Sequence, residues 1–179
     1  MLSKSTGSEL TDTLSQEYET FRTRDLSGEP VASLFIDTGY EPLRRWGNKT
    51  EVLWVWAICE DGRKVLLSLS TTNSASYESC WEVLRGLAKR GRHPPVTITT
   101  DGALGLTKAI DARWPKSLRL RCWFHKRQNL QQKVPALAWP EVKALIVDMR
   151  DAPTREKAEE RRDQIVARYQ HEFPEACRC

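Results

Sequence analysis

Two acids and a cysteine–histidine pair stand out as residues whose types and spacing could do chemistry. Asp37 ends the apolar run "VASLFID", and Asp101 opens an Asp-Gly turn directly after "VTITT". Cys122 and His125 follow in the spacing Cys-x-x-His. An acid at the end of a core strand lies at the edge of the sheet, where ligands bind in open α/β folds. Asp37 and Asp101 are far apart in sequence, so they meet only if their strands are neighbours.

A divalent metal would suit the two acids. Two carboxylates that meet repel each other, so a cation is expected to neutralise them. Mg²⁺ (or Mn²⁺) fits, because it prefers oxygen ligands and is held by one or two carboxylates together with substrate phosphates. Two such ions can clamp the attacking and leaving oxygens of an in-line phosphoryl transfer. The alternative that spacing leaves open is that Asp37 caps a turn and Asp101 only begins one.

The Cys-x-x-His pair allows three interpretations. With Cys177 and Cys179 it could form a Cys₃His zinc site, but Cys-x-Cys is tight for a zinc knuckle and we expect no zinc. If Cys122 ends a strand and His125 starts a helix, both face the edge of the sheet beside the acids. A protonated His125 could then contact a phosphate or orient water. The plainer alternative is a buried cysteine and a histidine that caps a helix.

Basic residues gather in one segment. From Arg113 to Lys133 there are seven Lys or Arg and no Asp or Glu, whereas the net charge of the whole chain is only +4. Such a block is typical of a phosphate-contacting surface, although a solvated helix face would look the same. Two further arginines beside Trp46 could follow a DNA backbone or stand in a hairpin loop with no partner. The candidate DNA contacts are Arg44, Arg45, Arg119, Arg121, Lys126, Arg127 and Lys133.

The hydrophobic pattern predicts the elements that would position these residues. We expect strands at 31–37, 51–59 and 64–70, a short strand before Asp101, and a strand over 117–124. We expect helices over 9–24, capped by Ser8, over 74–91 and over 103–114, and further helices from residue 125 onward with a break at 152–153. Three antiparallel strands followed by strand–helix units predict an α/β fold with a mixed sheet.

Composition places the chain among ordinary globular proteins. It has 179 residues, is 40% hydrophobic and 29% charged, and therefore has enough apolar material for a core. No apolar run approaches the roughly 18 residues needed to span a bilayer, and the N-terminus lacks the apolar region of a signal peptide. We expect a cytoplasmic protein without a membrane partner, whose five cysteines stay reduced.

Four stretches resemble successive blocks of the Mutator-type transposases of bacterial insertion sequences. They are "FIDTGYEPLRRWGNKT", "TTDGALGLTKAIDARWP", "LRLRCWFHKRQNLQQKVP" and "APTREKAEERRDQIVARYQHEFPEAC". The order D-G-x-x-G-L followed by C-x-x-H-K-x-x-N is specific to that group, and the resemblance extends over residues 2–178. It implies an RNase H-like core with an Asp-Asp-Glu triad and divalent metal. In that core Asp37 matches the first acid, Asp101 the second, and the Cys-x-x-His pair belongs near the site.

The resemblance also implies how the chain is divided. Residues 1–30 would be the remnant of a helix-turn-helix region with a linker helix, 31–135 a partial catalytic core, and 136–179 the beginning of a helical insertion. The family's third acid, a Glu in a motif like T-T-N-x-x-E after the insertion, has no counterpart. We interpret "TTNSAS" at 71–76 as the cap of the next helix. The acids of the insertion helices, Glu141, Glu156, Glu159 and Glu160, are interpreted as surface charges.

These observations lead to one main expectation about function and two alternatives. We expect a transposase that acts in DNA transposition by metal-dependent phosphodiester cleavage and strand transfer. We expect an incomplete copy, truncated at both ends, with little cleavage activity of its own. Its partners would be the element ends and target DNA, at the nucleoid, and a second copy or an intact transposase. The alternatives are a catalytically inactive DNA-binding remnant and a nuclease of the same fold with a compensating acid.

Overall fold

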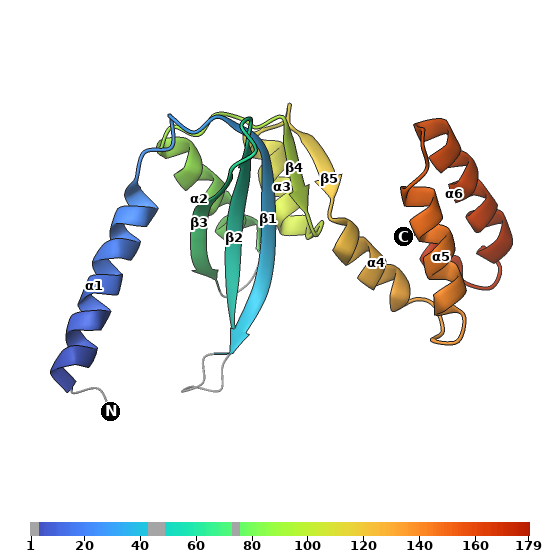
Figure 1. Ribbon diagram of the computed structural model, residues 1–179, viewed down its shortest axis with the longest axis horizontal. Coiled ribbons are helices and arrows are strands. Elements are labelled where there is room, and N and C mark those ends of the chain that lie inside the picture. Colours follow the sequence, from blue (N-terminus) through green and yellow to red (C-terminus); the bar gives the residue numbers. More distant parts are fainter. Residues whose placement is uncertain (1–3, 43–48, 73–75) are drawn as a thin grey trace. The chain divides into compact units, whose positions relative to one another are not determined.

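The computed structural model describes the backbone of residues 4–42, 49–72 and 76–179. Its elements, in chain order, are α1 (Lys4–Thr23), β1 (Val31–Pro42), β2 (Lys49–Cys59), β3 (Lys64–Thr72), α2 (Tyr77–Lys89), β4 (Thr97–Thr100), α3 (Leu104–Arg113), β5 (Leu118–Arg121), α4 (Trp123–Gln131), α5 (Trp139–Arg150), α6 (Arg155–Tyr169) and α7 (Pro174–Cys177) (Figure 1). The chain forms two compact units, Met1–Arg121 and Cys122–Cys179. Among the described residues, no helix is long and apolar enough to cross a membrane.

The first unit is built on a five-stranded mixed sheet in the order β3-β2-β1-β4-β5. β1, β2 and β3 pair antiparallel, whereas β4 is parallel to β1 and β5 is parallel to β4. Short turns can join the first three strands, but the parallel strands need crossovers, which α2 and α3 supply. The predicted mixed sheet is confirmed, and this order of strands is the RNase H-like arrangement.

One face of the sheet is covered by α2 and α3. Alternate residues of each strand point to it, so the core consists of strand residues such as Leu34, Ile36, Val55 and Ile98 packed against the two helices. The helices contribute Cys80, Leu84, Leu87, Leu106, Ala109 and Ile110. The spacing of apolar residues in this helix also predicts that Tyr77 is buried, which is wrong, because Tyr77 is the first residue of α2 and is 37% exposed.

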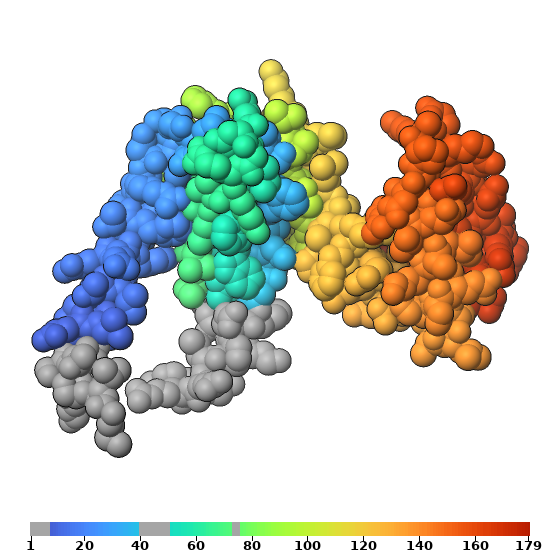
Figure 2. All heavy atoms as spheres, viewed as in Figure 1, coloured from blue at the N-terminus to red at the C-terminus, as the bar shows by residue number. Residues whose placement is uncertain are grey.

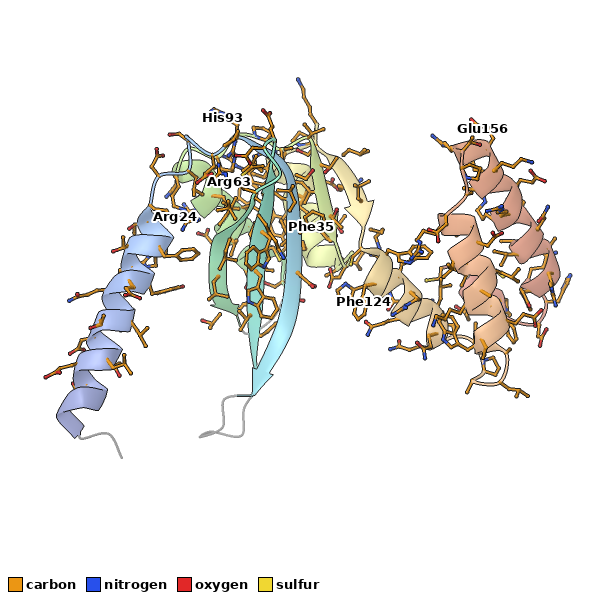
Figure 3. The ribbon with its side chains drawn as sticks, in the orientation of Figure 1. Arg24, Phe35, Arg63, His93, Phe124 and Glu156 are labelled. Atoms are coloured by element: carbon orange, nitrogen blue, oxygen red, sulfur yellow. The ribbon has the colours of Figure 1, made fainter. Side chains whose placement is uncertain are left out.

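On the opposite face of the sheet, described side chains of β1 and β2 are exposed or half-exposed. Residues of β2 and β3 lie at the surface in the space-filling view, with no other element of this unit in front of them (Figure 2). Phe35 on β1 is 44% exposed, and the neighbouring Trp54 and Trp56 are half-buried (Figure 3). Trp56 and Trp54 therefore contribute to the outer face, and the Lys64 ammonium lies 4.6 Å from the centroid of the Trp56 ring.

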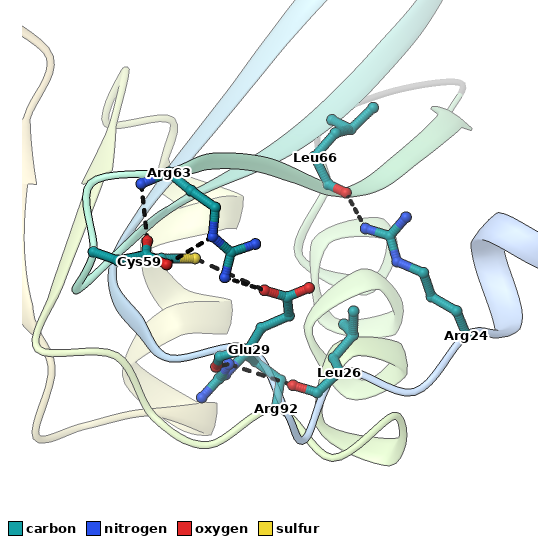
Figure 4. A network of polar contacts seen from close by, with 8 residues as sticks. Arg24, Leu26, Glu29, Cys59, Arg63, Leu66 and Arg92 are labelled. Carbon is teal, nitrogen blue, oxygen red and sulfur yellow. Dashed lines mark hydrogen bonds and ion pairs between the residues drawn. The ribbon is translucent and has the colours of Figure 1, made fainter.

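Arginine side chains attach the connector between α1 and β1 to the rest of the sheet. The Arg92 guanidinium is 8% exposed and donates to the carbonyl oxygens of Glu29 at 2.5 Å and Leu26 at 3.5 Å (Figure 4). Its burial lowers the pKa of the Arg92 guanidinium. Arg24 donates to the carbonyl of Leu66 at 2.5 Å. These bonds to backbone oxygens hold the entry into β1, the strand that carries Asp37.

Two predicted boundaries need correction. The first helix begins at Lys4 and not after a cap at Ser8, because the helical pattern continues through Gly7. The strand predicted over 117–124 ends at Arg121, and Trp123 begins α4. Its partner β4 ends at Thr100, which is paired with Arg121, so β5 has no hydrogen-bonding neighbour beyond that residue. The predicted cap at 76 is confirmed, since the Ser76 hydroxyl accepts from the Ser79 amide at 3.2 Å.

The second unit is helical. Its small core is formed by Val134, Val142, Ile146, Tyr169, Phe173 and Ala176. Three of the acids interpreted as surface charges pair with basic side chains: Glu141 with Arg168, Glu159 with Arg155 and Glu160 with Lys157. The boundary between the two compact units lies between residues 121 and 122, whereas the sequence predicts that the partial catalytic core extends to residue 135. The division of the chain into three functional parts stays a prediction.

Candidate active site

Asp37 and Asp101 lie on neighbouring strands at the same level of the sheet. Residues 33–36 of β1 pair in register with residues 97–100 of β4, and the last pair is Ile36 with Thr100. Asp37 and Asp101 are the next residues on each side. Since adjacent strands are about 4.8 Å apart, this register brings the two backbones together where the carboxylates branch off. Asp37 follows the buried Ile36, so its side chain points to the open face.

Asp37 does not end its strand, which is a correction. β1 continues to Pro42 because β2 remains its antiparallel partner as far as Lys49. What ends at Asp37 is the pairing with β4 on the other side. Gly39, two residues further on the same face, leaves room for the Trp54 ring, which a Cβ there would overlap. The Asp37 carboxylate is therefore half-exposed within β1, opposite Trp54 of β2 and at the point where the pairing with β4 ends.

The turn after β4 holds Asp101 in a defined conformation. One carboxylate oxygen, Oδ1, accepts from the Ala103 amide at 2.9 Å, and the Thr100 hydroxyl accepts from the Gly102 amide at 3.1 Å. Gly102 has φ +84°, a conformation that favours glycine. The backbone of this turn therefore favours glycine directly after Asp101. Asp101 both begins the turn, as the plainer interpretation predicted, and stands beside Asp37, as the metal interpretation requires.

A third carboxylate lies near this end of the sheet, and sequence reasoning missed it. Glu51, near the start of β2, is only 7% exposed. It and Asp101 both lie within electrostatic range of Cys80 in the first turn of α2. Burial is the main reason that the pKa of the Cys80 thiol is raised to about 11, and the two carboxylates raise it further. Nothing in the sequence around Glu51 distinguishes it from an exposed residue at the start of a strand.

The donor set of the acidic pair suits a hard cation held partly by its substrate. Both residues offer carboxylate oxygens and are half-exposed, so water or a phosphate could complete the coordination. Within residues 4–42, 49–72 and 76–179, no group of three or more His, Cys, Asp or Glu side chains is arranged to hold a metal ion. The residues therefore fit one ion of the magnesium type held by two carboxylates and external ligands.

The basic candidates of the first unit differ in their surroundings. Arg119 pairs with Asp111 at 3.0 Å, so its charge is already compensated. Arg121 lies against the Asp101 turn, since a Cβ on Gly102 would overlap its guanidinium. Arg44 and Arg45 lie outside the described residues.

The remaining candidates belong to the second unit. Cys122 precedes α4 without capping it through its side chain, and His125 is in the first turn of that helix, in edge contact with the Phe124 ring at 5.5 Å. The Arg127 guanidinium lies 5.7 Å from the centroid of the same ring, and Lys133 is exposed beyond the end of α4. The proposed roles of Cys122, His125, Lys126, Arg127 and Lys133 beside the acids of the first unit stay predictions.

Comparison with known proteins identifies the family. The model of the family described as "Transposase, Mutator family" matches residues 1–179. The chain belongs to the Mutator family of transposases. The transposase for insertion sequence element IS6120 of Mycolicibacterium smegmatis is 33% identical over 175 residues, which are 98% of this chain and 54% of that protein. The transposase for element IST2 of Acidithiobacillus ferrooxidans is 31% identical over 138 residues, which are 76% of this chain and 47% of that protein.

This member of the Mutator family thus spans about half the length of the curated relatives that it matches. Among solved structures, the catalytic core domain of HTLV-2 integrase in complex with magnesium matches 76% of this chain and 85% of that chain. The TM-score is 0.38 and the identity 11%, which is too weak a likeness to support an inference about activity. Family membership therefore rests on the sequence, and the RNase H-like sheet on its own strand order.

Proposed function

We propose that this chain supplies two of the metal ligands of a DNA transposase that cleaves phosphodiesters and transfers strands. The observation that carries the proposal is the register of β1 and β4, in which Ile36 pairs with Thr100 and the next residues are Asp37 and Asp101. Membership of the Mutator family agrees with it. When bound, Mg²⁺ or Mn²⁺ supplies the positive charge that polarises the reacting phosphate and the attacking oxygen.

The reaction that fits this site consists of two in-line displacements. In the first, the oxygen of water bonds to phosphorus at the element end while the bond from phosphorus to the 3′ oxygen breaks, which releases a 3′-hydroxyl. In the second, that hydroxyl attacks a phosphodiester of the target, and the target's own 3′ oxygen leaves. Asp37 and Asp101 would hold the ion, and the hydrogen bond from the Ala103 amide would fix the orientation of the Asp101 carboxylate.

A non-catalytic DNA-binding protein remains the second candidate. The observation that favours it is that the described residues offer no group of three ligands for a metal ion. A chain of this kind would keep the fold and the basic surface. Its interaction with DNA would then depend on Arg121 and the other candidate contacts and would be independent of Asp37 and Asp101.

Metal binding in solution separates the two candidates. Mn²⁺ or Mg²⁺ should raise the melting temperature of the chain, because a ligand that binds only the folded state stabilises it. Asp37→Asn and Asp101→Asn should each remove most of that rise. Asp61→Asn, in the turn between β2 and β3, is the matched control and should keep it. A metal response that survives in the Asp37→Asn/Asp101→Asn double variant would refute the shared site.

A further inference from the structure

A groove lies next to the Asp101 turn and has no assigned role. It runs between β5 and α3, has a volume of about 550 Å³, and is lined by Thr100, Gly102, Leu104, Thr107, Ile110, Asp111, Pro115 and residues 117–121. All of its lining residues belong to the first unit. Gly102, the glycine of the Asp101 turn, is one of the lining residues, so a ligand in the groove lies beside that turn.

The charge in the groove is concentrated on one side chain. Arg119 is paired with Asp111, and that pair is half-exposed. Arg121 is exposed and, within the described part of the chain, makes no ion pair or side-chain hydrogen bond. A free guanidinium offers five N–H donors in a planar fork that matches two oxygens of a phosphate. The groove therefore presents one uncompensated cation, Arg121, which lies against Gly102 of the Asp101 turn.

The position of this guanidinium is set by the absence of a side chain on Gly102. Any Cβ at that residue would overlap the Arg121 guanidinium, so the group lies directly on the backbone of the turn. Arg121 is also the last residue of β5 and is paired in register with Thr100, the residue before Asp101. Both observations fix the arginine to the same turn that carries the acid, from the neighbouring strand.

We propose that Arg121 binds a phosphate of the DNA strand that enters the groove between β5 and α3, and so holds that strand beside the turn that carries Asp101. The proposal rests on the function proposed above and assigns to one arginine the anchoring of the reacting strand. A phosphodiester backbone fits the groove because each nucleotide brings one anionic group, and the groove offers one free cation beside a metal site. Arg119, whose charge Asp111 compensates, contributes little to the affinity.

The test is the salt dependence of binding to a fluorescein-labelled DNA duplex, measured by fluorescence anisotropy in EDTA and in Mn²⁺. Arg121→Gln should weaken binding about tenfold, as expected for a charge-assisted contact, and should lower the salt slope by about one. Lys89→Gln is the matched control, with the same change of charge at an exposed position at the end of α2, outside the basic segment 113–133. It should change the affinity less than about twofold and leave the salt slope nearly unchanged.

Two further measurements make the outcomes distinct. Arg121→Gln should keep the metal-induced rise in melting temperature that Asp101→Asn loses. If that rise is present and Arg121→Gln binds DNA no worse than Lys89→Gln, this inference is wrong and the metal site stands. If no variant of the acids changes the metal response, the proposed function fails independently. If Arg121→Gln does not fold, Arg121→Lys replaces it, because lysine keeps the positive charge without the planar guanidinium. The affinity of Arg121→Lys for DNA should be several-fold lower than that of the unaltered chain, with the same salt slope. An unchanged DNA affinity of Arg121→Lys would overturn the inference.

Discussion

Replacing Asp101 by Asn is expected to stabilise the metal-free protein while abolishing its response to metal. Asp37 and Asp101 follow directly on the register pair of Ile36 and Thr100, so we expect their carboxylates to lie close together. Two like charges about 5–6 Å apart repel by about 0.7 kcal/mol in water and by more near a protein surface. Since both side chains are half-exposed, the free energy of unfolding should rise by about 0.5–1 kcal/mol in Asp101→Asn.

The hydrogen bonds of the turn decide which substitution shows the effect cleanly. The Asn side chain keeps an oxygen that can accept from the Ala103 amide, a bond of 2.9 Å in the structure. Asp101→Ala relieves the same repulsion but loses that bond, which offsets the gain by about 1 kcal/mol. We therefore expect Asp101→Asn to be more stable than the unaltered chain, and Asp101→Ala to be about equal to it.

Urea unfolding followed by circular dichroism, in EDTA at low and at high salt, measures these differences. The gain in Asp101→Asn should shrink at high salt, because repulsion between half-exposed charges is screened. With Mn²⁺ the order should reverse, since the unaltered chain gains RT ln(1 + [Mn²⁺]/Kd) and the variant does not. A variant that is less stable than the unaltered chain in EDTA, or a difference that salt leaves unchanged, would refute the idea that the two carboxylates share one site.

Two further predictions concern a turn glycine and a buried thiol of the first unit. Gly91→Ala should lower the free energy of unfolding by about 2–4 kcal/mol in a urea titration, because Gly91, just after the end of α2, has φ +88° and a Cβ there would lie 2.8 Å from Cβ of Ser27. Gly86→Ala, inside α2, has open space around the added Cβ and should be neutral or stabilising by about 0.5–1 kcal/mol. Equal effects of the two substitutions would contradict this reasoning. The Cys80 thiol is fully buried and has a pKa of about 11, so it should resist a thiol reagent at pH 8 in the native protein and react after unfolding in urea. The half-buried Cys177 thiol should react in both states. Equal reaction rates of the two thiols in the native protein would show that Cys80 is accessible.

The fold was predictable from sequence because its main signals are local. Runs of apolar, β-branched and aromatic residues indicate the first three strands, and the Asp-Gly sequence at 61–62 indicates the hairpin turn between the second and the third. The exact ends depended on partners that the local pattern does not contain. β1 continues past Asp37 because β2 is still beside it, and β5 stops at Arg121 because β4 has ended.

The candidate site was predictable only in part. The Asp-Gly sequence and the family motif pointed to Asp101, and the strand pattern pointed to Asp37. The sequence "LRLR" does not show which of its two arginines is paired. The charge of Arg119 is compensated by Asp111 on α3, whereas Arg121 has no such ion pair among the described residues. The burial of Glu51 likewise depends on packing around the start of β2, for which its neighbours in sequence give no signal.

The pairing of β1 with β4 has a consequence for the order of folding. The antiparallel strands β1 to β3 contact their neighbours along the chain, so they can form early, whereas Ile36 meets Thr100 only after the intervening hairpins and α2 have been brought together. Contacts across such a long loop carry a larger entropic cost and form late in small proteins. The acidic pair should therefore be assembled in the last stage of folding, and a partly folded chain would expose two separated aspartates with little affinity for a metal ion.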